Sequence, residues 1–324
     1  MPSRLWTIAA NTYCESIRQP VFVVLLCGAS LLLMLNIAVC GYAFEDDNKL
    51  LLDLGLSTIF LGGLLLAAFT ATGVFSREIE NKTVLTVISK PVGRPLFVAG
   101  KFLGVAAALA TACWVWTLLF MLTVRHGVMT RANDPFDEPV LLFGLGGFAL
   151  AGLLAASANY AYRWVFASTF TGALVVIESI AYILVLCLGK GFVIQPPETD
   201  FDPRLWLAAL LVFEALAVLC AVAIAVSTRL GQVMTLAICS AVFLLGLSSD
   251  FLFRARAEEN ALAKIAYSLV PNLNFHWLAE LLHREHTHLD ELWPLLGLVS
   301  AYSALHVAAI LALAVAFFQT REVG

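Results

Sequence analysis

The chain alternates long apolar runs with polar segments. Eight of the runs approach the roughly 20 residues that an α-helix needs to cross about 30 Å of hydrocarbon. We therefore predict eight membrane-spanning helices, at residues 20–43, 54–75, 96–124, 139–157, 167–189, 204–227, 231–250 and 292–318. Because this number is even, both ends of the chain are expected on one side of the membrane.

Composition agrees with this pattern. Of the 324 residues, 61% are hydrophobic and 13% are charged, against about 45–50% and about 25% in soluble domains. The predicted fold class is all-α, a polytopic helical bundle in which residues 1–324 form a single transmembrane domain. The net charge of −4 argues against a surface for nucleic acid. The cysteines lie mostly in or beside apolar runs, which is typical of packing residues rather than of disulfides.

The first residues predict a helix of a different kind. In residues 3–18, apolar residues recur near helical spacing between polar ones, so we expect an amphipathic helix in the membrane interface. Its apolar face consists of Leu5, Trp6, Ala9, Tyr13 and Ile17. The segment lacks the basic, apolar and small-residue order of a signal peptide, so no cleavage is expected.

The distribution of cations orients the bundle. Five of them, from Arg77 to Lys101, lie in or beside the short segment between the second and third runs. Cytoplasmic segments are enriched in Lys and Arg, so this segment and both termini are expected in the cytoplasm. The protein would then be an integral multi-pass protein of a bacterial inner membrane.

Small and aromatic residues indicate how the helices pack. Small residues recur about four apart in the fourth run, from Gly144 to Ala155, and predict close approach of two helices. Trp164, Trp206 and Trp293 lie near the ends of runs, where we expect them to act as anchors at the level of the lipid headgroups.

The cytoplasmic segment at residues 76–95 is predicted to start as a helix capped by Ser76 and to end in a turn rich in proline and glycine. Its apolar face is expected to contain Ile79, Val84, Val87 and Ile88. A short amphipathic helix between two spans is either a docking element for a soluble partner or a loop on the membrane surface.

The segment at residues 251–291, on the opposite side, is too apolar for an ordinary loop. We predict a helix at 257–270, a turn at 271–274 and a short helix around 275–282. Apolar surface left in water costs about 25 cal/mol per Å², so the segment should pack on the outer face of the bundle or dip into it, where it could cover a pore. The residues expected to do so are Leu262, Ile265, Ala266, Leu269, Trp277, Leu278, Leu281 and Leu282.

In their order and spacing these features resemble the permease subunits of type-2 ATP-binding-cassette (ABC-2) exporters. The family's pattern is an acidic helix start, a Thr-x-Leu, a Pro-x-x-Arg turn and a Lys that opens the next span. The residues here that are similar to it are Arg77-Glu78, Thr83, Leu85, Pro91, Arg94 and Lys101. The amino-terminal helix ending at Pro20 looks like the family's elbow helix. Ser227-Thr228-Arg229 and the Pro271-Asn272 element before the last span also match. Many members have six spans, so two spans here look like an added pair.

The resemblance implies a transport subunit that catalyses no reaction itself. It would pair with a second permease copy or a paralogue and with cytoplasmic ABC ATP-binding subunits, within membrane lipid and without nucleic acid. The sequence contains no Gly-x-x-x-x-Gly-Lys-Ser/Thr loop, so ATP and magnesium are expected on the partner and no cofactor on this chain. The residues assigned to coupling with the ATPase are Arg77, Glu78, Ile79, Glu80, Thr83, Val84, Leu85, Val87, Pro91, Arg94 and Lys101.

Glu178 and Glu214 lie near the middle of the fifth and sixth runs. An ionised carboxylate there costs several kcal/mol, so each should be protonated, paired or exposed to a polar cavity. The two runs are antiparallel neighbours, so the carboxyl groups could lie close together and share a proton or a cation. Alternatively, each is hydrogen-bonded to a neighbour such as Thr171, Ser179 or Tyr182.

Histidines offer weaker candidates. His306, in the last run, is expected to be either a neutral packing residue with one hydrogen bond or a functional group. The outer histidines fit no hydrolase motif, and a hydrated loop is the alternative to a metal site there. The weak metal-ligand candidates are His283, His286 and His288.

Two other function classes stay open on the sequence alone. An ion-coupled secondary transporter would use Glu178 and Glu214 as proton or ion sites, although no repeated halves are visible. A polytopic membrane enzyme would place its chemistry at the outer histidines.

Overall fold

The computed structural model describes residues 2–41, 47–80, 93–129, 135–258, 260–278, 282 and 289–319. Within these ranges, 7 helices are long and apolar enough to cross a membrane, and a bent helix pair raises the number to 8. The prediction of an all-α, multi-pass membrane protein is therefore confirmed, and each predicted span corresponds to one of these elements.

The long helices are α2 (Pro20–Cys40), α3 (Asp47–Glu80), α5 (Arg94–His126), α7 (Gly146–Tyr162), α8 (Phe166–Cys187), α9 (Pro203–Ser227) and α14 (Leu289–Gln319). The short α6 (Glu138–Val140) and the π-helical turn η1 (Leu141–Leu145) lead directly into α7. The bent pair joins α10 (Gln232–Leu247) to η4 (Asp250–Arg254) and α11 (Ala255–Ala257) at an angle of 61°.

Shorter elements complete the described chain. The first helix is α1 (Pro2–Ile17), and the connection between α8 and α9 contains the 3₁₀ turns η2 (Lys190–Phe192) and η3 (Pro197–Thr199). After the bent pair come α12 (Ala261–Leu269) and the 3₁₀ turn η5 (Leu273–His276).

Local sequence explains several helix ends. Proline occupies the first turn of α2, α5 and α9, where its missing N–H costs no hydrogen bond. Asp202 caps α9 by accepting a hydrogen bond of 2.9 Å from the backbone N–H of Arg204. Arg163 ends α7 in the left-handed conformation, with φ of 55°.

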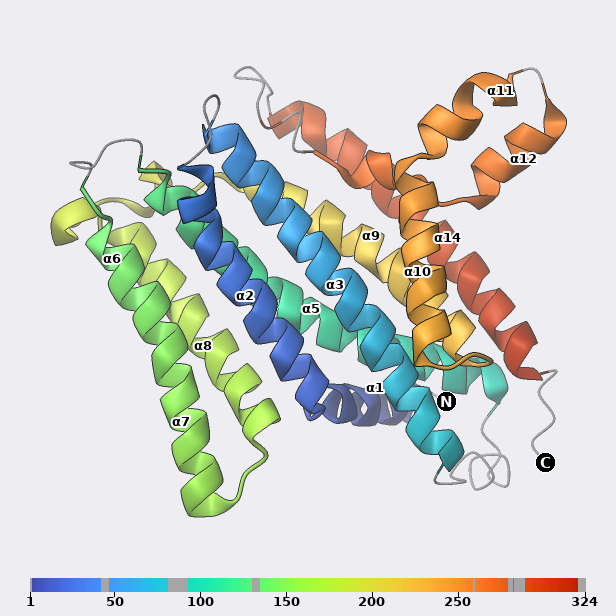
Figure 1. Ribbon diagram of the computed structural model, residues 1–324, viewed down its shortest axis with the longest axis horizontal. Coiled ribbons are helices and arrows are strands. Elements are labelled where there is room, and N and C mark those ends of the chain that lie inside the picture. The colour runs from blue at the N-terminus through green and yellow to red at the C-terminus, as the bar shows by residue number, and fades with distance from the viewer. Residues whose placement is uncertain are drawn as a thin grey trace.

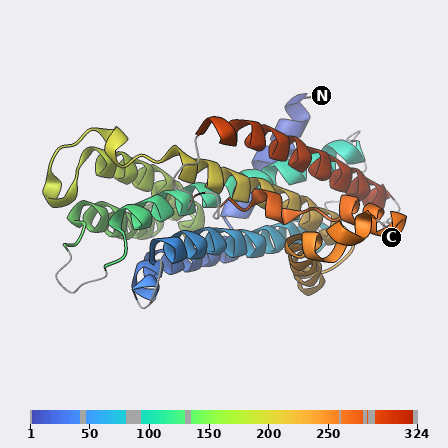
Figure 2. The same ribbon diagram turned by 90° about the horizontal axis from the view of Figure 1, so that it is seen from above.

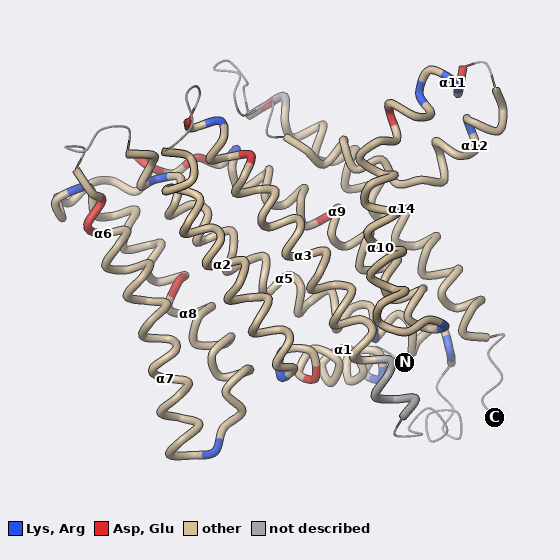
Figure 3. The backbone as a smooth tube through the Cα atoms, in the orientation of Figure 1, with Lys and Arg blue, Asp and Glu red and all other residues tan. Residues whose placement is uncertain are grey.

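The long helices lie side by side, and α1 crosses their lower ends in Figure 1. Both the start of α1 and the end of α14 lie at this end of the molecule, here called the amino-terminal end. Because both lie at the same end, this arrangement agrees with a chain that crosses the membrane an even number of times. Figure 3 shows that charged residues gather toward the two ends of the helices and leave the middle nearly free of charge.

The centre of the bundle is α5, which packs against α1, α2, α3, α8, α9 and α14. In Figure 2, α3 and α14 lie on opposite sides of the layer that contains α5 and α9. Trp116 of α5 is fully buried, and its ring N–H donates a hydrogen bond of 3.1 Å to the carbonyl of Leu26 on α2.

Small residues allow two of the closest helix contacts. A Cβ on Gly104 of α5 would lie 2.6 Å from the backbone carbonyl oxygen of Ala9, so α1 can dock only against glycine there. On α7, the buried residues are Gly147, Ala151 and Ala155, and α7 packs on α8. The close packing predicted for the fourth run is therefore confirmed.

Two sequence predictions differ from the structure. Ser76 caps no separate helix, because α3 continues without a break to Glu80. On α12, Leu262 and Leu269 are 74% and 73% exposed, so this helix does not pack on the bundle as predicted. Trp206 lies in the first turn of α9, near the end of a span as predicted, and its ring lies 5.5 Å from that of Trp114.

The other half of the outer segment behaves as expected. Leu278 is buried, and the ring of Trp277 stacks on Phe60 of α3 at 6.4 Å. The turn η5 replaces the start of the short helix predicted around 275–282, and residues 277 and 278 are not helical. Leu281 lies outside the described residues.

Candidate functional site

The segment predicted to couple to an ATPase is described only at its edges. Arg77, Glu78, Ile79 and Glu80 form the last turn of α3, while Thr83, Val84, Leu85, Val87 and Pro91 lie outside the described residues. The apolar run of α3 ends at Phe75, so about 8 Å of helix continues beyond it to Glu80. This extension lies at the amino-terminal end of the molecule (Figure 1).

Arg94 makes contacts within the chain. Its Nη1 donates a hydrogen bond of 2.7 Å to the carbonyl of Gln319, and Arg229 donates from Nε and Nη2 to the carbonyl of Phe317 at 3.0 and 2.7 Å. The ring of Phe97 stacks on Phe318 at 5.6 Å. Cations favour the carbonyl end of a helix, so the first turn of α5 and the α9–α10 turn together hold the end of α14.

Lys101 faces the amino-terminal helix. Its Nζ lies 4.0 Å from Oε2 of Glu15 and 5.6 Å from the ring centroid of Phe97. The side chain is only 5% exposed. Lys101 therefore joins α5 to α1 inside the protein, and a role in coupling would be indirect.

Glu178 lies on the face of α8 that packs against α7. It is fully buried, and its Oε1 lies 3.1 Å from the position that a Cβ on Gly147 would take. Neither carboxyl oxygen has a hydrogen-bond partner in the described part of the chain. The expected neighbours bond elsewhere, because Thr171 and Ser179 donate to backbone carbonyls of α8 and the Tyr182 hydroxyl accepts from Trp206.

Glu214 lies in a different part of the bundle. Its Oε1 accepts a hydrogen bond of 2.6 Å from the hydroxyl of Ser300 on α14, while its Oε2 is buried without a partner among the described residues. Glu178 faces α7, and α8 and α9 make little contact with each other. The hypothesis that the two carboxyl groups share a proton or a cation is therefore wrong.

A polar cluster beside the bend after α10 was not anticipated. Oδ1 of Asp250 accepts hydrogen bonds from the Tyr267 hydroxyl at 2.7 Å and from the Asn272 amide at 2.8 Å. The backbone N–H of Asn272 donates to the Tyr302 hydroxyl on α14 at 2.7 Å. The signal in the sequence was an aspartate at the end of an apolar run and the following Pro271-Asn272 element.

Histidines extend this cluster along α14. His276 is 1% exposed, and its Nε2 lies 2.7 Å from the Ser303 hydroxyl. His306 is half-buried, with Nδ1 at 3.1 Å from the carbonyl of Tyr302. The interpretation of His306 as a packing residue with one hydrogen bond fits this geometry. Burial is the main cause that lowers the pKa of His276 to about 4, and the nearby His306 contributes in the same direction.

Arg125 organises the end of the bundle opposite to α1. Its Nε lies 3.3 Å from Asp137, which precedes α6, and 3.2 Å from Asp200, which precedes α9. Nη2 donates to the carbonyl of Leu188 at the end of α8. One guanidinium therefore connects α5 to three other segments, and Asp137 is completely buried beside it.

The outer histidines His283, His286 and His288 lie outside the described residues. Among the residues that the structure does describe, no group of three or more His, Cys, Asp or Glu side chains could hold a metal ion.

Comparison with known proteins leaves the family open. No protein-family model matches this chain, and no curated protein matches it in sequence. The class that fold and sequence define is a polytopic helical membrane protein, with 7 or 8 candidate spans in the described part of the chain.

Proposed function

We propose that this chain is the membrane-spanning permease subunit of an ATP-driven exporter of the ABC-2 type. It forms the translocation path and couples to a separate cytoplasmic ATP-binding subunit, with a second permease copy or a paralogue completing the transporter. ATP and magnesium belong to the ATP-binding subunit, and the permease itself carries no catalytic residue.

The observation that best supports this proposal is the continuity of α3 through Glu80. A force applied at residues 77–80 acts on a helix that runs without a break into the membrane. Because α3 packs on α5 and α9, movement of its end displaces the centre of the bundle. The amphipathic α1, packed across α5, fits the elbow helix expected in this class.

In this mechanism the ATP-binding subunit receives the segment 76–95 in a surface cleft. Glu78 and Glu80 face cations of the partner, and Ile79, Val84 and Val87 provide apolar anchors. Closure of the ATP-binding subunits on ATP then moves the segment as a lever, which tilts α3 and α5.

The test is purification of the tagged chain in mild detergent, with identification of bound proteins and an ATPase assay. We expect a phosphate-loop ATPase to be recovered, and to be lost when Ile79, Val84 and Val87 are changed to Asp. Val193→Asp with Ile194→Asp is the matched control, because both residues are exposed at the opposite end. Equal loss of the ATPase in the control, or a chain that purifies alone in several detergents, would contradict the proposal.

A second candidate is an ion-coupled transporter, which the buried and unbonded carboxyl groups favour. Glu178 has no partner for either oxygen, and Glu214 has none for Oε2, among the described residues. Buried acids in membrane spans frequently serve proton or ion movement. Transport that continues without ATP and stops on Glu178→Gln would favour this candidate over the exporter.

A further inference from the structure

One narrow stripe of the central helix α5 is left uncovered by its neighbours. It follows positions i, i+3, i+4, i+7, i+8 and i+11, which form one face of a helix. The residues of the stripe are Leu103, Ala106, Ala107, Ala110, Thr111 and Trp114. α8 and α9 both pack against α5 but make little contact with each other, so the stripe forms the floor of a groove between them.

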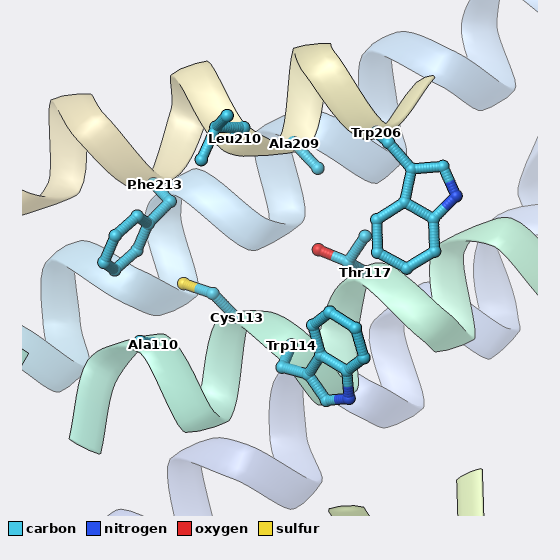
Figure 4. Close-up of a pocket in the computed structure, with 8 residues that line it drawn as sticks. All are labelled: Ala110, Cys113, Trp114, Thr117, Trp206, Ala209, Leu210 and Phe213. Atoms are coloured by element: carbon cyan, nitrogen blue, oxygen red, sulfur yellow. The ribbon is translucent and has the colours of Figure 1, made fainter. Parts of the chain in front are cut away.

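Three neighbouring cavities make up this groove. One of about 500 Å³ lies between α1, α5 and α9, and another of about 470 Å³ lies between α1, α5 and α8. A third of about 210 Å³ lies between α5 and α9, with the side chains shown in Figure 4. Ala110 lines all three, so the cavities adjoin one another along α5.

An aromatic cluster closes the groove at the end away from α1. The rings of Trp114 and Trp206 lie 5.5 Å apart, from α5 and α9, and Figure 4 shows both beside Thr117. The ring N–H of Trp114 donates to the Ser179 hydroxyl at 3.0 Å, and that of Trp206 donates to the Tyr182 hydroxyl at 3.3 Å. These contacts join α5, α8 and α9 at this point.

The length and volume of the groove indicate what kind of molecule can fill it. Leu103 and Thr117 are about 21 Å apart along the helix axis, somewhat more than the roughly 15 Å depth of one leaflet of hydrocarbon. An α-helix about 10 Å wide and this long occupies on the order of 1,600 Å³. The three cavities together hold about 1,180 Å³, which is less than such a helix needs and enough for a single flexible chain.

The lining also favours an apolar occupant. Alanine and aromatic side chains provide most of it, and its polar groups already have partners. Thr111 donates to the carbonyl of Ala107 at 2.9 Å and lies 3.3 Å from the Tyr13 hydroxyl, and both tryptophan N–H groups are bonded. At the open end Trp6 is 74% exposed on α1, as amphipathic rings are at the level of lipid headgroups.

We propose that this groove binds one acyl chain of a membrane phospholipid from the leaflet in which α1 lies. The chain runs along Ala107 and Ala110 toward Trp114, and the headgroup stays beside α1. A bound chain fills the space between α8 and α9 and holds the two helices apart. The proposal does not depend on an ATPase partner, so it can fail or succeed separately from the proposed function.

The experiment uses the full-length protein in vesicles that contain a phospholipid with a photoreactive group on its acyl chain. After illumination, mass spectrometry locates the labelled residues. We expect the groove, at residues 103–117 and 206–213, to be labelled several-fold more than exposed α7 positions such as Leu153. Equal labelling of α7 would indicate ordinary solvation by lipid and overturn the proposal.

Filling the groove provides the matched comparison. Ala110→Phe should remove most of the excess labelling, whereas Ala156→Phe, at an exposed alanine of α7, should leave it unchanged. Ala107→Phe serves the same purpose if Ala110→Phe does not fold. A disulfide-linked dimer formed by Ala107→Cys, with no groove labelling in the native protein, would show that a second copy covers this face and would refute the proposal.

Discussion

Replacing Glu178 with methionine should stabilise the protein, because the structure gives this carboxyl group no compensating partner. It is fully buried on α8, and neither oxygen accepts a hydrogen bond from a described residue. A buried polar group without a partner costs about 1–3 kcal/mol. Methionine is unbranched, so it suits the narrow space beside Gly147 better than leucine does, where overpacking would cost about 1–3 kcal/mol.

The expected gain in unfolding free energy for Glu178→Met is therefore about 1–3 kcal/mol. Titration of the purified protein with a denaturing detergent, followed by tryptophan fluorescence, measures it. Glu178→Gln keeps a polar group and should gain much less. Glu198→Met is the control, because it makes the same chemical change at an exposed position of η3 and should stay within about 0.5 kcal/mol of the native protein.

One result would refute this reasoning, and another would add a functional role to it. A loss of stability for Glu178→Met would show that the carboxyl group has a stabilising partner. A gain in stability together with a complete loss of transport would show that Glu178 is kept for function at a cost in stability. The second result would favour the ion-coupled candidate, whereas unchanged transport would assign the residue no role in coupling.

Three further substitutions test the polar contacts at the end away from α1. Arg125→Gln leaves the buried Asp137 without its cation and should lower the free energy of unfolding by about 3–5 kcal/mol. Adding Asp137→Asn should restore part of this loss, and a double variant that is no more stable than the single one would contradict the reasoning. Tyr302→Phe removes the acceptor for the backbone N–H of Asn272 and should lower stability by about 1–3 kcal/mol. Limited proteolysis should then cleave α12 faster, and an unchanged cleavage rate would contradict this prediction. Burial lowers the pKa of His276 to about 4 in the folded protein, whereas the pKa of an unperturbed histidine is about 6.5. Below about pH 6.5 the imidazole therefore binds a proton in the unfolded chain and not in the folded protein. The free energy of unfolding should accordingly fall by about 2 kcal/mol from pH 7 to pH 5. His276→Gln should flatten this profile, and a wild-type profile that is already flat would exclude the mechanism.

The spans were predictable because each depends on a local property, an apolar run long enough to cross the bilayer. The ends of the helices were less predictable from the sequence. Ser76 has the chemistry of a cap, but the helical ladder of α3 already satisfies the backbone and continues to Glu80. The exposed leucines of α12 have the periodicity of a buried face, yet periodicity does not say whether a second surface is present to cover them.

The positions of polar groups relative to one another were not predictable from spacing along the chain. Glu178 and Glu214 lie on spans that are consecutive in sequence, and only the packing shows that one faces α7 and the other Ser300 of α14. The contact of Asp250 with Asn272 depends on a 61° bend after α10. The groove on α5 was hidden for the same reason, because it is a gap left by helices from distant parts of the chain.

The two walls of that groove differ in how firmly the rest of the bundle holds them. α9 packs against α3, α5, α10 and α14, whereas α8 packs mainly against α7 and α5. The start of α5 is also tied to the end of α14 by Arg94 and to α1 by Lys101. Under the proposed coupling through α3, we therefore expect α1, α5, α9 and α14 to move together and the α7–α8 pair to change position relative to them. Opening and closing of the groove should accordingly follow the movement of α8, with the hydrogen bond between Trp114 and Ser179 as the contact that breaks first.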